Sequence, residues 1–308
     1  MKHHLIALLT LIMVSGAAQA FEVVKVNERV YALVGDLGQR SAENLGHNMT
    51  SGFIVGDNGV AVVDPGACHT DAAAIETAIR NVTDKPVRWV INTGGQDHRW
   101  LANGYFKKQG AEIVASAAGR EFMQENAEQQ ISNIKQRVGD ACGEPSPVFP
   151  DKTLTDRYQL PMQGLNVELR FTGGAHTPGD LFVWLPKDKI LFTGDAVYVQ
   201  RLLGVFPGGL QRWINTLEIM RDELKPEILV PGHGHVTQLN EALRDSYDYL
   251  TMLKQRIEQR IAEGAFDPVE AAEGLDQSEF SYLRNYDQLS FRAMNALRAA
   301  EELFAAEE

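Results

Sequence analysis

The sequence predicts an α/β protein built from two sheet-and-helix layers. Short apolar runs bounded by turn residues recur in both halves of the chain, for example Val87–Ile91 and Ile190–Thr193, and such runs are typical of strands. Between them lie segments with apolar residues at helical spacing, such as Thr70–Val82. No linker of biased composition divides the chain, so we expect one domain in which helices cover sheets.

Composition limits the classes of function. Hydrophobic residues make up 44% and charged residues 23% of the 308 residues, and the formal net charge is -12. These fractions are ordinary for a globular protein. The acidic balance argues against a nucleic-acid partner or an anionic membrane surface, because few cations are available to neutralise phosphates. We expect a small-molecule substrate, and no feature of the sequence indicates a particular protein partner.

The first twenty residues have the pattern of a signal peptide. Lys2 precedes the apolar run Leu5–Val14, and Ala18-Gln19-Ala20 forms a small-residue cleavage site before Phe21. The apolar run is shorter than the roughly 20 residues that a transmembrane helix needs. No cysteine stands at the cleavage site, so we expect no lipid anchor. The predicted mature domain is therefore residues 21–308, exported to a bacterial periplasm.

The chain contains two cysteines, Cys68 and Cys142. An oxidising compartment would allow one disulfide between them. Two separate buried thiols are equally consistent with the sequence.

The first half begins with β-structure. A hairpin is expected over residues 21–34, with Asn27-Glu28 as its turn, and a second hairpin around Asp57-Asn58-Gly59. A polar loop, residues 35–50, separates the two. The helix at 70–82 and the strand at 87–91 follow, and helices are expected at about 100–109 and 120–137.

The second half also combines strands and helices, and it ends in helices. Strands are expected at 165–171, 181–185, 190–193 and 228–230, and a helix at about 210–224. From residue 239 to residue 261, apolar residues fall on one helical face. We therefore expect a C-terminal helical extension over about residues 239–308.

Polar side chains stand at the ends of several predicted strands, in loops rich in glycine and proline. They are Asp97 and His98, His176 in Gly174–Asp180, Asp195 in Thr193-Gly194-Asp195, and His233 in Pro231–His235. Glycine permits the close backbone approach that a buried ion site needs. Imidazole and carboxylate together suit zinc, manganese or iron.

These motifs, in this order, resemble those of the metallo-β-lactamase fold superfamily. The resemblance implies an αββα sandwich with the site at one edge, here with additional C-terminal helices. The usual first motif of the superfamily is HxHxDH, and alignment on Asp97 and His98 places Thr93 and Gly95 where its two leading histidines would stand. Alignment on Asn92-Thr93 instead places Gly94 at the first of them. Both histidines are absent in either alignment.

The resemblance implies that five residues of the remaining motifs are metal ligands: Asp97, His98, His176, Asp195 and His233. The first metal position retains only His176 and a share of Asp195, and two ligands hold a divalent ion poorly. We therefore expect one metal ion, held by Asp97, His98, Asp195 and His233. Zinc is the expected ion, with iron and manganese as alternatives. Asp97 and His176 are the expected catalytic residues, His176 as a proton donor or substrate contact.

The predicted function is an exported hydrolase that uses a metal-activated water on a small-molecule ester, thioester or related substrate. Asp195, where true β-lactamases typically carry cysteine, makes the motifs more similar to the glyoxalase II type. The alternative is a catalytically degenerate metal- or ligand-binding protein on the same fold. The apolar segment Gln200–Gly209 is interpreted either as a wall of the substrate pocket or as ordinary core.

Overall fold

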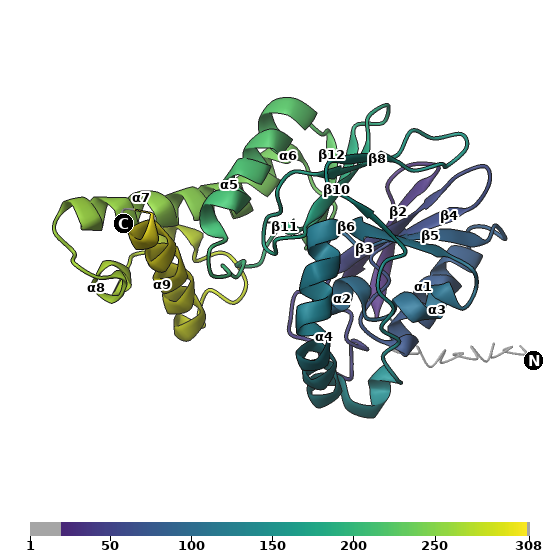
Figure 1. The fold of residues 1–308 in the computed structure, drawn as a ribbon, viewed down its shortest axis with the longest axis horizontal. Helices are drawn as coiled ribbons and strands as arrows, with labels where there is room; N and C mark the ends of the chain where they lie inside the picture. The colour runs from purple at the N-terminus through teal and green to yellow at the C-terminus, as the bar shows by residue number, and fades with distance from the viewer. Residues whose placement is uncertain (1–19, 307–308) are drawn as a thin grey trace, which may run out of the picture.

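Two β-sheets face each other, with helices on their outer faces (Figure 1). The computed structural model describes residues 20–306. The predicted signal peptide, apart from Ala20, lies outside the described residues. Within residues 20–306, no helix combines the length and the apolar character needed to cross a bilayer.

The first sheet contains seven strands in sequence order, antiparallel from β1 to β4 and parallel from β4 to β7. The two hairpins predicted in the first half are confirmed, with Val24 opposite Ala32 in one and Phe53 opposite Val62 in the other. The strands are β1 (Phe21–Lys25), β2 (Val30–Gly35), β3 (Thr50–Val55), β4 (Val60–Val63), β5 (Val87–Ile91), β6 (Glu112–Ser116) and β7 (Lys152–Leu154).

The second sheet contains five strands in the order β12-β11-β10-β9-β8. Its last two strands in sequence, β11 and β12, run parallel, and their register shifts at Gly194. The strands are β8 (Arg157–Gln159), β9 (Glu168–Phe171), β10 (Leu181–Leu185), β11 (Ile190–Tyr198) and β12 (Ile228–His233).

Helices form the two outer layers. They are α1 (His69–Arg80), α2 (Asp97–Trp100), α3 (Asn103–Lys107), α4 (Ala117–Val138), α5 (Leu210–Ile219), α6 (Leu239–Ala242), α7 (Asp248–Ala262), α8 (Pro268–Ala272) and α9 (Leu289–Ala305). Single turns of 3₁₀-helix lie at Gly139–Cys142 and Ser278–Phe280, and π-helical turns follow α5 and α6 at Met220–Leu224 and Leu243–Tyr247. The helix expected at 100–109 is therefore two short helices, and Asp97 and His98 begin α2 rather than lying in a loop.

Three apolar layers build the sandwich. Between the sheets, Ile54 and Val114 of the first sheet pack in one cluster with Val183 of the second. On the outer face of the first sheet, Ile75 of α1 and Phe106 of α3 are buried in a second cluster. The αββα architecture is thereby confirmed.

The third layer joins the C-terminal helices to the second sheet. Phe182 of β10, Trp213 of α5, Leu250 of α7 and Ala296 of α9 belong to one buried cluster. In Figure 1 this helical part extends away from the sandwich on the side of the second sheet. The C-terminal helices thus continue the outer apolar layer of that sheet.

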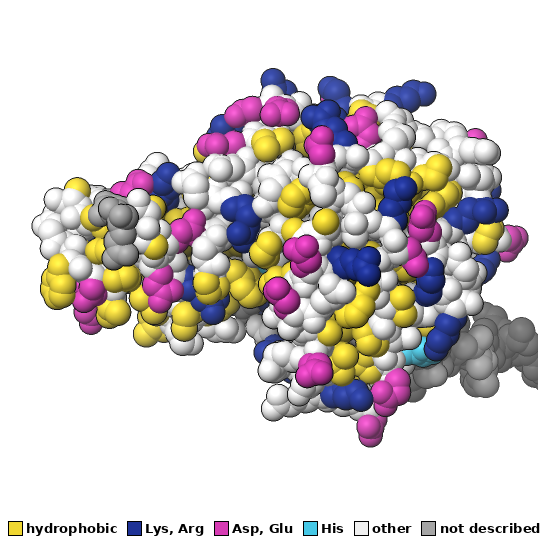
Figure 2. Space-filling model, viewed as in Figure 1, with side chains coloured by type: hydrophobic (Ala, Val, Ile, Leu, Met, Phe, Trp, Pro, Cys, Tyr) yellow, Lys and Arg dark blue, Asp and Glu magenta, His cyan; other side chains and the backbone are white. Residues whose placement is uncertain are grey.

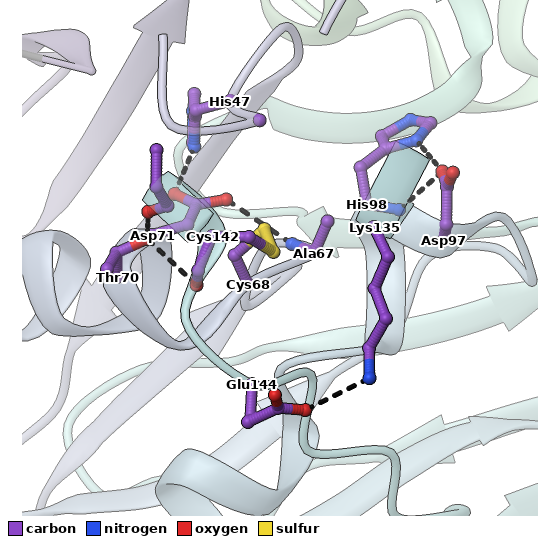
Figure 3. The surroundings of a disulfide bond; sticks show 12 residues. His47, Ala67, Cys68, Thr70, Asp71, Asp97, His98, Lys135, Cys142 and Glu144 are labelled. Carbon is purple, nitrogen blue, oxygen red and sulfur yellow. Dashed lines mark hydrogen bonds and ion pairs between the residues drawn. A yellow bond between two sulfur atoms is a disulfide. The ribbon is translucent and has the colours of Figure 1, made fainter. Parts of the chain in front are cut away.

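The two cysteines are paired. The Cα atoms of Cys68 and Cys142 lie 5.0 Å apart, and the bond links the start of α1 to the 3₁₀ turn that follows α4 (Figure 3). Both residues are fully buried. Of the two alternatives that the sequence leaves open, the structure has the disulfide.

Surface charge is dispersed. On the face drawn in Figure 2, acidic and basic side chains are interspersed rather than gathered by sign. Exposed large apolar residues concentrate on the C-terminal helices and their connections, where Phe266, Val269, Leu289 and Met294 are 44–80% exposed.

Candidate metal centre

Three of the predicted ligands meet beside the strands β11 and β12. Asp195 lies on β11, His233 is the last residue of β12, and His98 comes from the first turn of α2. One ligand atom from each lies within 4.8 Å of the others, and all three residues are buried. The parallel pairing of β11 with β12 places Gly194 opposite Pro231 and Tyr198 opposite His233, and the side chains of Asp195 and His233 meet across this irregular stretch.

The carboxylate of Asp195 stands at the centre of this group. Its Oδ2 lies 3.2 Å from Nε2 of His98, and its Oδ1 lies 3.2 Å from Nε2 of His233. The Arg99 guanidinium donates to both oxygens, from Nη2 at 2.6 Å and from Nε at 3.2 Å. Burial opposes ionisation of Asp195, but Arg99, His98 and His233 together outweigh burial and hold the pKa of that carboxyl well below its usual range.

Arg99 is itself fully buried and holds a second carboxylate. Its Nη1 donates to Asp64 Oδ2 at 2.8 Å, and its Nη2 also donates to the carbonyl of Gly232 at 2.9 Å. Asp64 in turn accepts from the backbone N–H and the hydroxyl of Thr93, each at 2.7 Å. A guanidinium supplies five donors in a rigid fork. Arg99 therefore fixes the ends of β4, β5, β11 and β12 relative to one another.

The protonation of His233 is determined by its other ring nitrogen. Nδ1 lies 2.7 Å from the carbonyl oxygen of Asn48, which can only accept, so Nδ1 carries the proton. Burial, with Arg201 nearby, holds the pKa of His233 well below its usual range, so the ring is neutral. Its Nε2 lone pair therefore faces the Asp195 carboxylate without a proton between them.

Asp97 lies beside this group rather than within it. Its Oδ1 accepts from the backbone N–H of His98 at 2.8 Å and lies 2.9 Å from Nδ1 of the same residue (Figure 3). Arg40 contacts Asp97 and the same ring nitrogen. Burial opposes ionisation, but Arg40 and His98 lower the pKa of Asp97 to about 2. A carboxylate on the far nitrogen of a histidine is the usual way to orient a metal-binding imidazole.

His176 is buried, and aromatic side chains surround its ring. Its ring centroid lies 4.6 Å from that of Phe206, 5.1 Å from that of Trp213 and 5.8 Å from that of Tyr198. Neither ring nitrogen reaches a hydrogen-bond partner with good geometry among residues 20–306. Burial lowers the pKa of His176 to about 4, so it is neutral at pH 7. A buried neutral imidazole with both nitrogens free is suited to bind a ligand or an ion.

Side chains at Gly94 or Gly95 would meet neighbouring residues. A Cβ atom on Gly94 would lie 2.5 Å from Oδ1 of Asp180, and one on Gly95 would lie 2.6 Å from the Phe122 ring. Asp180 is fixed by the backbone N–H of Thr177 at 2.8 Å. A histidine at Gly94 or Gly95 would therefore have to displace Asp180 or Phe122, and Thr93 uses its hydroxyl to donate to Asp64.

The residues present fit one divalent ion. Two imidazole nitrogens and one carboxylate, with an open position, form the ligand set of many catalytic zinc sites. The Nε2 atom of His98 is buried and has no hydrogen bond of good geometry within the described part of the chain. The His233 lone pair faces an anion, an arrangement that a cation between them would stabilise. His98, Asp195 and His233 are therefore the group that could hold the ion.

A cavity of about 260 Å³ opens beside these residues. Its walls include Arg40, Asp97 and Phe206, together with polar residues of α4. The segment 200–209 contributes both to the apolar core, where Leu203 and Val205 are fully buried, and to the wall of the cavity, which Phe206 lines.

The arginines are the functional residues that the motif analysis missed. Arg40, Arg99 and Arg201 all contact the predicted ligands or their neighbours. Arg99 directly follows His98, so its position at the start of α2 was the available signal. Arg40 lies far from the motifs in sequence. Arg201 follows Asp195 closely, but nothing in the sequence indicates that its side chain reaches His233.

Comparison with known proteins agrees with this geometry. A family model described as the metallo-beta-lactamase superfamily matches residues 46–233, more than half of the chain. A metallo-beta-lactamase type 2 of Bacteroides fragilis is 23% identical over 218 residues, which cover 69% of this chain and 78% of that protein.

Solved structures show the same fold. A metallo-beta-lactamase from Pontibacter korlensis matches with a TM-score of 0.60 and 21% identity, covering 75% of this chain and 99% of that one. A stereoselective inverting sec-alkylsulfatase from Pseudomonas sp. matches with a TM-score of 0.67 and 17% identity, covering 93% of this chain and 51% of that one. The second match is wide enough to include the C-terminal helices. On the family match and this shared fold, the chain belongs to the metallo-β-lactamase superfamily.

Proposed function

We propose that this protein is a metal-dependent hydrolase that acts on a small-molecule ester, thioester or related substrate. The observation that carries the proposal is the pair of imidazole Nε2 atoms, from His98 and His233, each 3.2 Å from a different oxygen of Asp195. When bound there, a divalent ion, zinc before iron or manganese, would supply a water nucleophile at neutral pH and Lewis acidity. Membership of the superfamily supports the same class of reaction.

The surrounding residues would have distinct tasks. Asp97 would orient the His98 ring, and the carbonyl of Asn48 would orient His233. Arg99 would keep Asp195 ionised. His176, neutral at pH 7, would serve as a hydrogen-bond partner of the substrate rather than as an imidazolium acid.

Export to the periplasm is part of the proposal. The Cys68–Cys142 disulfide supports it, because disulfides persist in oxidising compartments. The predicted signal peptide supports it from the sequence.

A hydrolysis panel tests the proposal. Thioester, phosphoester, sulfate ester, lactone and β-lactam substrates would be assayed with the purified mature protein after incubation with Zn²⁺. We expect turnover of at least one class, lost in Asp195→Asn and retained in Asp188→Asn, a matched change at an exposed aspartate. Tight metal binding without turnover of any class would instead favour the degenerate binding protein.

A further inference from the structure

His47 and Asp71 form a polar pair inside the protein, apart from the metal centre. Both side chains are fully buried, and Nδ1 of His47 lies 2.6 Å from Oδ1 of Asp71 (Figure 3). The other ring nitrogen, Nε2, has no hydrogen-bond partner among residues 20–306, and the ring packs against that of Phe21 with the centroids 4.7 Å apart. A buried polar pair is often no more stabilising than apolar residues of the same volume, so stability alone does not explain it.

Asp71 has a fixed position in the first layer of helices. It lies in the first turn of α1, which packs on the first sheet through Ile75. Its second oxygen accepts from the backbone N–H of Ala67 at 3.3 Å. The Cys68–Cys142 disulfide holds the residue that directly precedes the helix. A side chain that contacts Asp71 is therefore attached to a rigid element.

His47 lies in a segment that has no regular structure of its own. Residues 41–49 belong to no helix or strand, and β3 begins after them. Leu45 and Gly46 have left-handed φ values of 53° and 79°, so the chain turns sharply just before His47. The backbone N–H groups of these three residues bond to carbonyls of the same segment. The position of the segment in the fold therefore depends on side chains, and His47 attaches it to α1.

Asn48, the next residue, supplies the acceptor that fixes His233. Its carbonyl oxygen lies 2.7 Å from Nδ1 of His233, and Nε2 of the same ring lies 3.2 Å from Asp195. The side chain of Asn48 donates to the carbonyl of Gly38 at 3.1 Å, which is a contact within the loop that precedes β3. The hydrogen bond at one ring nitrogen sets which tautomer an imidazole adopts and how the ring is oriented. A shift of the backbone at residues 47–48 would remove this control over His233.

We propose that His47 and Asp71 are positioning residues of the metal centre: their buried contact holds the carbonyl of Asn48 against Nδ1 of His233. The inference rests on the proposed function for the metal ion alone, because the contact between Asn48 and His233 is seen directly. Neither His47 nor Asp71 touches the ligand atoms. Loss of a group that orients a metal ligand lowers metal affinity by about 10–100-fold.

Proton NMR of the mature protein, freed of metal with a chelator, tests the positioning itself. The Nδ1 proton of His233 is buried and hydrogen-bonded, so it should exchange slowly with water, and its resonance is assigned by its loss in His233→Ala. His47→Leu removes the contact to Asp71, whereas the amide of His47→Asn can donate from near the position of Nδ1. We expect at least about tenfold faster exchange in His47→Leu and slow exchange again in His47→Asn.

Zinc affinity, measured in competition with a chromophoric chelator at a temperature where every variant is folded, is the second readout. We expect about 10–100-fold weaker binding of Zn²⁺ in His47→Leu and in Asp71→Ala, and near wild-type affinity in His47→Asn. Leu185→Ala is the control. Leu185 is fully buried and pairs with Ile190 at the start of β11, away from Asp195, so its truncation lowers stability but should leave zinc affinity unchanged.

Unchanged exchange of the His233 proton in His47→Leu would overturn the proposal. Faster exchange with unaltered zinc affinity would overturn it as well, and so would an equal loss of affinity in Leu185→Ala, because destabilisation alone would then explain the effect. Faster exchange in His47→Leu of a protein that binds no Zn²⁺ would remove the proposed function and leave the positioning of His233 standing.

Discussion

At the scale of single residues, the centre is built from histidines whose second nitrogen is already occupied. His233 gives its Nδ1 proton to a backbone carbonyl, and His98 faces Asp97 with its Nδ1. Both rings therefore direct Nε2 towards the two oxygens of Asp195. The sequence motif treats Asp97 and His98 as equal ligands, whereas their positions favour one ligand and one orienting group.

The Asp97→Asn variant tests this division. Substitution of a residue that orients a metal ligand lowers metal affinity by about 10–100-fold, but the site still binds metal. We therefore expect Asp97→Asn to bind Zn²⁺ about 10–100-fold more weakly, and His98→Ala to lose binding, in competition with a chromophoric chelator. Complete loss of Zn²⁺ binding in Asp97→Asn would show that Asp97 is itself a metal ligand, as the resemblance implies.

The buried histidines also predict how stability depends on pH. The pKa of His176 is about 4 in the folded protein and about 6.5 in an unfolded chain. Between these values the unfolded state binds more protons, so the free energy of unfolding falls as the pH falls from about 6.5 to about 4. The metal-free protein should lose on the order of 3 kcal/mol over this window through His176 alone.

Urea unfolding of wild type and His176→Leu at several pH values between about 7 and about 4 measures this effect. The variant should show a shallower decline, while His233 contributes the same sign in both proteins. Parallel declines would show that His176 is protonated in the folded state or open to solvent.

At the scale of secondary-structure elements, the walls of the site are held by long-range links. The Cys68–Cys142 disulfide ties the segment after α4 to the start of α1, and the Thr70 hydroxyl donates to the carbonyls of Ala141 and Cys142 at 2.8 and 3.0 Å. The residues of α4 line the cavity. The disulfide therefore fixes the end of one cavity wall.

Removal of the disulfide should destabilise the protein without changing its fold. It closes a loop of 74 residues, and loss of such a bond costs about 2–5 kcal/mol. We expect this decrease in the free energy of unfolding for the Cys68→Ser/Cys142→Ser double variant, measured with denaturant. Reductant should destabilise the wild type by a similar amount and leave the double variant unaffected; wild-type stability that is insensitive to complete reduction would rule this role out.

At the scale of the whole molecule, the C-terminal helices support the segment that carries Phe206. Asn295 of α9 accepts from the backbone N–H of Val205 at 2.9 Å and donates to the carbonyl of Leu203 at 2.8 Å. Glu302 accepts from the first two backbone N–H groups of α5, at 2.7 and 2.9 Å, where an anion is stabilised by the helix dipole. The extension is thus joined to the site by buried polar contacts as well as by apolar packing.

Asn295→Ala should therefore affect both stability and substrate binding. Unpaired buried backbone groups cost about 1–3 kcal/mol each, so we expect at least that loss in the free energy of unfolding. We also expect a higher KM with little change in kcat, because the cavity wall loosens while the metal centre is untouched. Asn215→Ala, on the exposed side of α5, is the control and should change neither quantity. A stable Asn295→Ala variant with unaltered KM would contradict this support.

Sequence reasoning predicted the architecture because periodicity and turn chemistry are local signals. The two hairpins, the strands that carry Asp195 and His233 and the C-terminal helices follow from such signals, although β11 continues past Asp195 to Tyr198. The split into α2 and α3 did not, because a two-residue break leaves the apolar spacing intact. The arginines at the site escaped prediction for another reason: folding alone brings Arg40 to Asp97 and Arg201 to His233.

The number of metal ions bound per chain shows whether His98, Asp195 and His233 form a single-ion centre. The mature protein would be reconstituted with excess Zn²⁺, passed through gel filtration and measured by inductively coupled plasma mass spectrometry, with His233→Ala alongside. The three-residue centre predicts one ion per wild-type chain and none in the variant. No ion in the wild type, or two ions, would rule out a single-ion centre.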